Sequence, residues 1–423
     1  MTSFKAFLKA GHTPTLFAAF FYLGFSFFIW VLNGAMAPFI SETFHLTAAQ
    51  KGLMLSIPIL AGALMRFPLG LLSQYIGRKS ATLVELSLIA VAMGYGFFMV
   101  HSFDYMIRMA LLLGVAGASF GVAMSLGSGW YPPQYKGLAM GLVGAGNGGT
   151  VIAVLLAPPL AQRFGWQTVY GFAALSTLVP MLVIVLFAKE PPDRPQHATL
   201  RQQLACLAER DGWVFSLIYA VTFGGFIGLT TFLPTYYYDQ FGVSKVQAGQ
   251  LTMLAAFMGS AVRIAGGWMS DRWGGVNTLT LVLLVISLAL VAAGPASGSL
   301  VLTTVLLMLC FTALGAGNGA VFQLVPLRWP LTTAVAGSMI GEIGALGGGF
   351  VPTAMGYAKQ LTGSYLPGFV ALAGSALLML VLMRRMQIHW TRTWAEKGGR
   401  ARLQPVAESS AAPVRPLGVR RVG

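Results

Sequence analysis

Two arginines in this sequence lie where a charged side chain costs free energy. Arg66 and Arg263 each lie well inside a long apolar run. A charged side chain at the centre of a bilayer costs on the order of 2.5–3.5 kcal/mol on insertion scales, so it usually faces a protein interior or a cavity. One such arginine taken alone could equally extend to the membrane surface or pair with an acid. Two of them in matching surroundings favour a shared binding role.

The surroundings of the two arginines match in spacing. Each arginine stands four residues before one glycine and eleven before another. These glycines are Gly70, Gly77, Gly267 and Gly274. Equivalent positions in two similar halves would face each other across a central axis, where carriers with internal repeats place their substrate. Guanidinium groups are planar, permanently charged and donate in pairs, so two of them suit a small planar oxyanion better than two lysines would.

A second pattern repeats further along each half. Four glycines at spacings of four, three and four recur in both halves, namely Gly137, Gly141, Gly144 and Gly148, and Gly337, Gly341, Gly344 and Gly348. This spacing places them on one helix face and lets neighbouring backbones approach closely. Tight packing alone would explain the pattern. The functional alternative is that smooth glycine faces let two halves of the molecule move against each other.

The glycines to which we assign this conformational role are the following set. They are Gly141, Gly144, Gly146, Gly148, Gly149, Gly341, Gly344, Gly347 and Gly348. Asn147 lies inside the first glycine-rich run. A buried amide needs hydrogen-bond partners, so a substrate oxygen is a candidate partner for Asn147.

The elements that position these residues are membrane-spanning helices. Of 423 residues 56% are hydrophobic and 9% are charged, which indicates a membrane protein. Twelve apolar runs are long enough to cross a bilayer, which takes about 20 helical residues. The predicted spans are 15–40, 52–75, 80–100, 104–130, 137–160, 167–188, 212–238, 247–270, 277–297, 300–327, 332–357 and 364–383.

The net charge of +15 reflects the orientation of the chain in the membrane and does not indicate nucleic-acid binding. Most Lys and Arg residues fall on the side of the membrane that carries both termini, which the positive-inside rule makes cytoplasmic. The first apolar run follows two lysines, but it is too long for a signal peptide and is expected to remain as helix 1. Cys206 and Cys310 lie in different regions, so no disulfide or metal framework is expected.

The longest internal polar stretch divides the spans six and six. Residues 1–188 form the first half, residues 189–211 a cytoplasmic linker and residues 212–385 the second half. The basic tail, residues 386–423, has no apolar run and is expected to be disordered. The sequence thus predicts an all-α membrane protein with two pseudo-symmetric six-helix halves.

Two loop sequences resemble a known family. Residues 70–79, Gly-Leu-Leu-Ser-Gln-Tyr-Ile-Gly-Arg-Lys, resemble the loop signature between helices 2 and 3 of the major facilitator superfamily, and residues 267–274 resemble its copy in the second half. The first copy departs from the family by having Gln74 where Asp is usual. The second has Gly275 where a basic residue is common. The resemblance implies the major facilitator fold.

Within that superfamily the glycine-rich runs at residues 141–149 and 341–349 resemble the paired signature of the nitrate/nitrite porter family. That family clamps its anion between two arginines. The resemblance therefore implies that Arg66 and Arg263 bind the anion, and Asn147 matches the family's helix 5 asparagine.

Two further segments resemble the same family. Residues 216–224 resemble its helix 7 segment, which makes Tyr219 a hydrogen-bond donor and Phe223 an aromatic wall. Residues 114–120 resemble the helix 4 segment that supplies the opposing aromatic, which is Phe120 here. For each aromatic taken singly, a lipid-facing or packing role is the ordinary alternative.

Acidic residues bear on how transport is coupled. Glu85 and Glu342 lie inside predicted spans, and either could relay a proton; Glu342, beside Gly341, is the stronger candidate, although it could also be an ion-pair or amide partner. If no group in the path titrates, exchange of one monovalent anion for another is the simplest mechanism. Proton-coupled nitrate symport is the alternative, and a carrier for another small organic or inorganic anion is the more distant one.

Other classes of protein find little support. The chain has no phosphate-binding loop, no histidine pair with metal spacing and no nucleophile elbow, so an enzyme is not expected. A channel is disfavoured by the duplicated halves and their signature loops. The sequence predicts a monomeric, cofactor-free carrier of nitrate and nitrite in a bacterial cytoplasmic (inner) membrane.

Overall fold

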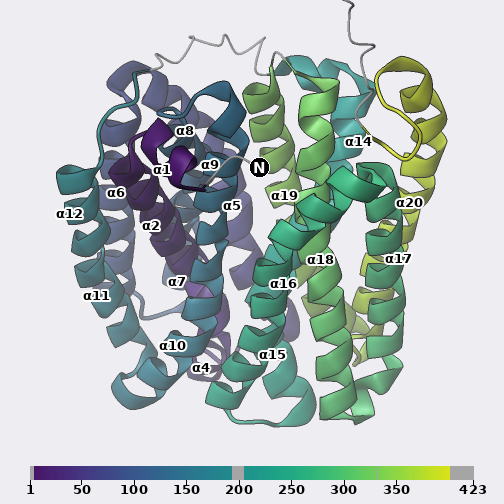
Figure 1. The fold of residues 1–423 in the computed structure, drawn as a ribbon. Helices are drawn as coiled ribbons and strands as arrows, with labels where there is room; N and C mark the ends of the chain where they lie inside the picture. The colour runs from purple at the N-terminus through teal and green to yellow at the C-terminus, as the bar shows by residue number, and fades with distance from the viewer. Residues whose placement is uncertain (1–3, 193–203, 331, 401–423) are drawn as a thin grey trace, which may run out of the picture.

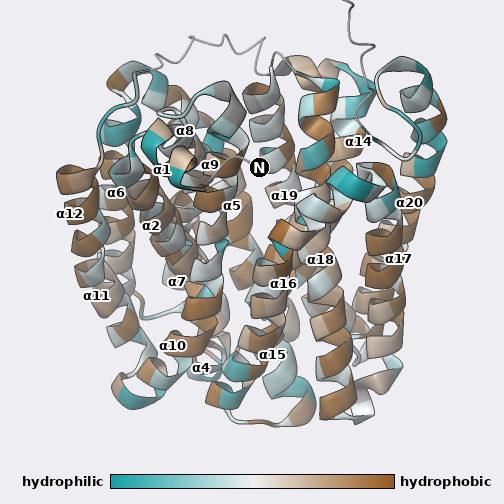
Figure 2. Cartoon of the chain, viewed as in Figure 1, coloured by the Kyte–Doolittle hydropathy of each residue, from teal (hydrophilic) through white to brown (hydrophobic). Residues whose placement is uncertain are grey.

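The computed structural model describes residues 4–192, 204–330 and 332–400, and within these ranges the chain is helical without a β-strand. In the described part of the chain, eleven helical stretches are long and apolar enough to span a membrane. Helix α19 (Thr333–Thr362) has the length of a twelfth, although its glycines and Glu342 dilute its apolar character. Figure 2 shows the apolar residues concentrated along the middle of the helices. The predicted twelve-helix membrane fold is confirmed.

The first half contains the following helices. They are α1 (Phe4–Ala10), α2 (Thr13–Trp30), α3 (Leu32–Ala35), α4 (Ala37–Thr43), α5 (Ala48–Ile76), α6 (Arg78–Phe98), α7 (Phe103–Leu113), η1 (Gly114–Ala118), α8 (Ser119–Ser128), α9 (Pro133–Gly144), η2 (Ala145–Gly148), α10 (Gly149–Phe164), α11 (Trp166–Ser176) and α12 (Leu178–Phe187).

The second half follows the same plan. Its helices are η3 (Leu204–Ala208), α14 (Arg210–Tyr219), η4 (Ala220–Gly224), α15 (Gly225–Phe241), α16 (Lys245–Trp273), α17 (Gly275–Ala293), η5 (Pro295–Gly298), α18 (Leu300–Arg328), α19 and α20 (Leu366–Thr393). The halves lie side by side, and they meet where α5 packs along α19 and α10 packs along α16 (Figure 1).

Five predicted spans are interrupted well inside their length, and one of them, the span at 167–188, divides at Thr177 into α11 and α12. The span predicted at 15–40 is divided into α2, α3 and α4, and the spans at 104–130 and 137–160 each tighten into a 3₁₀ turn, η1 and η2. The span at 212–238 widens into a π-helical turn, η4. Three of the breaks fall in glycine-rich sequence, where the helical backbone is least constrained. Such local departures from α-helix often mark functional positions.

Different contacts stabilise the two ends of the helical bundle. We call the end that carries α1 and the C-terminal part of α20 the terminal end, and the opposite end the distal end (Figure 1). At the distal end two ion pairs join the halves: the Lys51 ammonium lies 2.8 Å from the Asp239 carboxylate, and Lys245 pairs with Glu42. Tyr238 also donates to Glu42. The hydrogen bonds from Lys245 and Tyr238 hold the pKa of the Glu42 carboxyl below its usual value.

The signature loops build matching helix starts at the terminal end. Gly77 and Gly274, with φ of 87° and 91°, adopt a backbone conformation that other residues rarely tolerate. In the first half the Glu190 carboxylate accepts hydrogen bonds from the backbone N–H of Arg78 and Lys79 at 2.8 and 2.9 Å. The first backbone N–H groups of a helix lack intrahelical partners and favour a negative group.

The second half uses a different acceptor at the equivalent place. The backbone carbonyl of Gly398 accepts from the N–H of Val276 at 3.0 Å and from that of Asn277 at 3.3 Å. The segment after helix α20 therefore returns to cover the start of α17. A Cβ on Gly274 would lie 2.2 Å from the Gly398 carbonyl oxygen, so this glycine makes room for the returning segment, whereas a Cβ on Gly275 would lie 2.4 Å from Gln323 Oε1 of α18.

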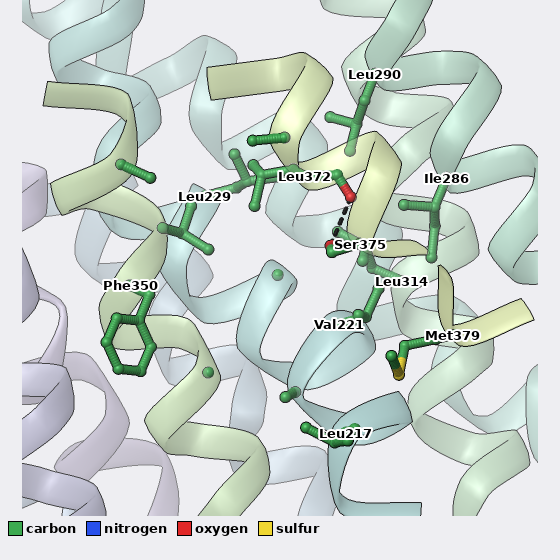
Figure 3. Close-up of a pocket in the computed structure, with 16 residues that line it drawn as sticks. Leu217, Val221, Leu229, Ile286, Leu290, Leu314, Phe350, Leu372, Ser375 and Met379 are labelled. Carbon is green, nitrogen blue, oxygen red and sulfur yellow. Dashed lines mark hydrogen bonds between the residues drawn. The ribbon is translucent and has the colours of Figure 1, made fainter. Parts of the chain in front are cut away.

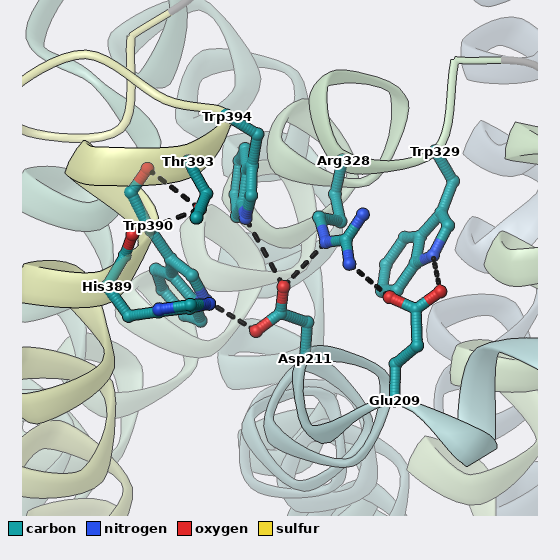
Figure 4. A network of polar contacts seen from close by, with 8 residues as sticks. All are labelled: Glu209, Asp211, Arg328, Trp329, His389, Trp390, Thr393 and Trp394. Atoms are coloured by element: carbon teal, nitrogen blue, oxygen red, sulfur yellow. Dashed lines mark hydrogen bonds and ion pairs between the residues drawn. The ribbon is translucent and has the colours of Figure 1, made fainter.

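A cluster around Asp211 fastens the terminal end of the second half (Figure 4). The buried Asp211 carboxylate accepts from the indole N–H of Trp390 at 2.7 Å, from that of Trp394 at 3.2 Å and from Arg328 Nε at 2.6 Å. Arg328 also pairs with Glu209. One carboxylate thus joins α14, α18 and α20.

This cluster corrects the predicted end of the second half. Helix α20 continues to Thr393, past both the predicted span end at 383 and the predicted half boundary at 385. The tryptophan contacts to Asp211 explain the extension, because they offset the ordering cost of the added helical turns. Of the predicted disordered tail, residues 386–393 continue α20, residues 394–400 follow it and return to the start of α17, and residues 401–423 lie outside the described residues.

We expect Asp211→Ala to destabilise the protein by about 2–4 kcal/mol, because two indole N–H groups and a guanidinium would lose a largely buried partner. Thermal unfolding of the purified protein in detergent measures this change. Glu209→Gln is the control, since the Glu209 side chain is 40% exposed and its loss should cost less than about 1 kcal/mol. Equal melting temperatures for the two variants would contradict a central role for Asp211.

Candidate anion-binding site

Arg66 is held in a defined orientation at the centre of α5. The side chain is buried, its Nε donates to the Gly117 carbonyl at 2.9 Å and its Nη1 donates to the Gly341 carbonyl at 2.8 Å. Gly117 belongs to the 3₁₀ turn η1 of the same half, whereas Gly341 belongs to α19 of the other half. The remaining nitrogen, Nη2, is buried without a hydrogen-bond partner in the described structure. Arg66 therefore keeps donor capacity for a ligand.

Aromatic rings surround the Arg66 guanidinium. Its Cζ atom lies 5.2 Å from the ring centroid of Phe120, 5.7 Å from that of Phe223 and 5.6 Å from that of Trp30. A cation over an aromatic face is attracted by the ring quadrupole, and the attraction is strongest where water is excluded. The predicted pair Phe120 and Phe223 is thus brought together, with centroids 6.5 Å apart.

Arg263 lies in α16 and faces the first half. Its Nη2 is 4.0 Å from the position that a Cβ atom on Gly144 would occupy, and its Nη1 is buried with no partner among the described residues. The two arginines therefore approach the opposite half's glycine signature in a related way, Arg66 at Gly341 and Arg263 at Gly144. This places both guanidinium groups at the interface between the halves, as the internal repeat predicts.

Tyr219 and Asn147 add two further polar groups to the site. The Tyr219 hydroxyl is buried close to the Arg263 side chain, and the charges of both arginines act on it, although no hydrogen bond of normal geometry reaches it among the described residues. Its ring stacks on Phe223 with a centroid distance of 5.1 Å and an interplanar angle of 6°. Asn147, in the 3₁₀ turn η2, is buried with an unpartnered Oδ1, and a flip of the amide would present a donor there instead.

Most signature glycines serve close packing within their own half. A Cβ on Gly344 would lie 2.3 Å from the Tyr219 ring, and one on Gly347 would lie 2.4 Å from Ala220. Gly146 and Gly149 similarly press against Gly24 of α2, and Gly348 presses against η4 and α15. These glycines let the helices bearing the site residues approach each other.

A smaller group of the glycines does not pack tightly within its own half. Gly341 borders Phe120 and Arg66, and Gly144 borders Arg263. A Cβ atom added at Gly141 or at Gly148 would meet no described atom within 4 Å, so these two glycines face open space. The role of the glycines in movement of the halves stays a prediction that rests on this smaller group.

The two acidic candidates occupy different places. Glu342, half-buried in α19 next to Gly341, lies 3.4 Å from the Ser338 hydroxyl, and its charge acts on Arg66 although the two form no ion pair within the described residues. Glu85 in α6 is fully buried, and neither carboxylate oxygen has a described partner. Glu342 therefore lies near Arg66, whereas no contact within the described residues connects Glu85 to either arginine.

A separate cavity in the second half is apolar. It has a volume of about 280 Å³ and is lined by residues of α14, η4, α15, α17, α18, α19 and α20, with Leu217, Val221, Phe350 and Met379 among its walls (Figure 3). Its one labelled polar side chain, Ser375, is bonded to the Leu372 carbonyl of its own helix at 2.7 Å. A cavity of this character offers no charged group that could stabilise an ion.

Sequence reasoning missed three contributors to the site. Trp30 of α2 and the carbonyl groups of Gly117 and Gly341 all contact Arg66. The two glycines stood within recognised motifs, but their backbone acceptors could not be read from residue type. Trp30 was one tryptophan in an apolar helix with no distinguishing local pattern.

Two helical halves enclosing paired guanidinium groups and unpartnered donors define a membrane carrier of the secondary-transporter class. The family model of the Major Facilitator Superfamily matches residues 16–352. The chain belongs to this superfamily and, within it, to the nitrate/nitrite porter family.

Two curated relatives illustrate the similarity. The nitrite extrusion protein of Bacillus subtilis (strain 168) is 30% identical over 374 residues, which cover 86% of this chain and 94% of the relative. The probable nitrate transporter NarT of Staphylococcus haemolyticus (strain JCSC1435) is 29% identical over 384 residues, covering 89% of this chain and 96% of the relative. Both similarities extend over nearly the whole transporter.

Solved structures support the fold. A bacterial homolog of the human lysosomal transporter Spinster, in an inward-facing and occupied conformation, aligns with a TM-score of 0.68 at 20% identity, covering 90% of this chain and 97% of that one. The human organic anion transporter MFSD10 aligns with a TM-score of 0.69 at 18% identity, covering 88% and 99%.

We expect Gly344→Ala to destabilise the protein by about 1–3 kcal/mol, the usual cost of overpacking, because the new Cβ would lie 2.3 Å from the Tyr219 ring. Thermal unfolding of the purified variant measures the change. Gly148→Ala is the matched control, since its Cβ would meet no atom within 4 Å. A Gly344→Ala protein as stable as Gly148→Ala would show that the close packing of α19 on Tyr219 is not needed.

Proposed function

We propose that this protein exchanges nitrate and nitrite across the bacterial cytoplasmic membrane by alternating access. The observation that carries the proposal is the convergence of unpartnered buried donors, Arg66 Nη2, Arg263 Nη1 and the Tyr219 hydroxyl, at the interface between the halves in the described part of the chain. Buried polar groups are normally hydrogen-bonded, and those that are not call for an explanation. A bound anion supplies the missing acceptors.

The shape of the site favours a small planar anion. Phe120 and Phe223 both lie close to the Arg66 guanidinium, with ring centroids 6.5 Å apart, and we propose that they form the aromatic walls of the anion site. Guanidinium forks match the geometry of planar oxyanions. Nitrate and nitrite fit this description, and the relatives are named for nitrite extrusion and nitrate transport.

Exchange follows from the charges of the site. Neither arginine forms an ion pair with a carboxylate in the described part of the chain, so an empty site holds two positive groups in a medium of low dielectric. Repulsion between the two arginines opposes closing of the carrier around an empty site. If a second anion binds before the carrier returns to its first conformation, the closed empty state is avoided. Proton-coupled symport is the alternative, and Glu342 is the residue that would serve it because its charge already acts on Arg66.

The ion pairs at the distal end indicate on which side of the membrane the carrier is closed. The positive-inside rule makes the terminal end cytoplasmic, and the distal end, closed by the Lys51–Asp239 and Lys245–Glu42 pairs, then faces outward. With this orientation the outer side of the protein is closed. The protein is proposed to act as a monomer, since one chain supplies both arginines.

Counterflow in proteoliposomes tests the proposal. Uptake of labelled nitrate is measured in vesicles that are empty or preloaded with nitrite, with and without an imposed proton gradient. We expect internal nitrite to accelerate uptake and the gradient to have little effect. Acceleration by the gradient alone, lost in Glu342→Gln, would replace exchange with symport. If another small anion and not nitrate moves, the substrate assignment fails while the carrier class stands.

We expect Arg66→Lys to weaken nitrate binding by about 10- to 100-fold, because lysine keeps the charge but cannot bond the Gly117 and Gly341 carbonyls while presenting a fixed donor. Binding of labelled nitrate to purified protein measures the affinity. Arg272→Lys, an exposed position at the end of α16, is the control and should leave the affinity unchanged. Full affinity in Arg66→Lys would exclude a role for the guanidinium fork.

A further inference from the structure

Trp30 is the last residue of α2 and belongs to a helix that contributes no charged residue to the site. The indole is almost completely buried, and its Nε1 donates a hydrogen bond of 2.8 Å to the Pro58 carbonyl of α5. Pro58 lies two turns before Arg66 along the same helix. The indole therefore links the first helix to the helix that carries the anion-binding arginine.

Two glycines make room for this indole. A Cβ on Gly117 would lie 2.3 Å from Trp30 Cε2, and one on Gly62 would lie 2.7 Å from Trp30 Nε1. Gly117 is also the residue whose carbonyl accepts the Arg66 Nε hydrogen bond. A displacement of the indole would consequently displace the carbonyl that orients Arg66. The ring also lies 5.6 Å from the guanidinium carbon itself.

The contacts of Arg66 divide between the two halves. Trp30, Phe120 and the Gly117 carbonyl belong to the same half as Arg66, whereas Phe223 and the Gly341 carbonyl belong to the other. Movement of one half against the other would break the second group and keep the first. The contacts within the first half can hold the guanidinium throughout the transport cycle.

We propose that Trp30 is a positioning residue for Arg66. It holds the guanidinium through its aromatic face and through Gly117, so that Nη2 stays directed at the anion while the halves move. This role acts through Arg66 and does not require contact between Trp30 and the anion. The inference rests on the proposed function in one respect only, which is that Arg66 binds the transported anion.

The experiment compares Trp30→Phe and Trp30→Leu with a matched control, Trp166→Phe. Trp166 is also buried, and its Nε1 donates to the Thr43 hydroxyl at 3.0 Å, near the distal end and away from the arginines. We expect Trp30→Phe to raise the KM for nitrate exchange by about tenfold with a smaller change in kcat, and Trp30→Leu to raise it further because no aromatic face remains. Trp166→Phe should keep the wild-type KM.

A second measurement does not depend on the substrate. Thermal unfolding of Trp30→Phe, Arg66→Lys and the double variant forms a cycle, and the same cycle is built with Trp166→Phe. The Trp30 and Arg66 changes should be non-additive, while the Trp166 and Arg66 changes should add. Unchanged KM in both Trp30 variants, or additivity in the Trp30 cycle, would overturn the positioning role. If the wild-type protein moves no nitrate, the proposed function fails, and the Trp30 cycle still decides this inference.

Discussion

The need to keep a guanidinium charged inside an apolar helical bundle governs the centre of this protein. Arg66 has no carboxylate paired with it in the described structure, so its charge is supported by two backbone carbonyls and three aromatic rings. One acceptor, the Gly117 carbonyl, lies in the 3₁₀ turn η1, and the other, the Gly341 carbonyl, lies within the continuous helix α19, where a carbonyl oxygen can still accept a second hydrogen bond. The buried charge is thus supported by backbone groups of both halves.

The same constraint explains why glycines stand where these helices meet. Rings and carbonyls can surround a guanidinium only if the helices that carry them approach closely, and a Cβ at Gly117 or Gly344 would collide with Trp30 or Tyr219. Close approach of backbones through small residues is how membrane helices associate without a hydrophobic driving force. The same glycines therefore serve both the packing of helices within each half and the assembly of the site.

The ends of the bundle are fastened by a different chemistry. Ion pairs join the halves at the distal end, and the Asp211 cluster ties three helices of one half at the terminal end. The centre has no described ion pair between the halves and relies on Arg66 to bridge them through Gly341. Contacts within one half can persist when the halves move, whereas contacts between the halves must break and be replaced by others. This difference provides the two-state element that alternating access needs.

The sequence by itself determined the membrane class, the twelve spans and the duplicated halves, and it singled out the six candidate residues of the anion site, because hydropathy and repeated spacing are local properties of a chain. It did not determine the helix breaks, the extension of α20 or the function of individual glycines. Arg66 and the Gly341 carbonyl are 275 residues apart in the chain, and no local pattern connects Trp30 to either. Only tertiary structure decides such contacts, since they depend on which faces of distant helices meet and which backbone groups those helices leave free.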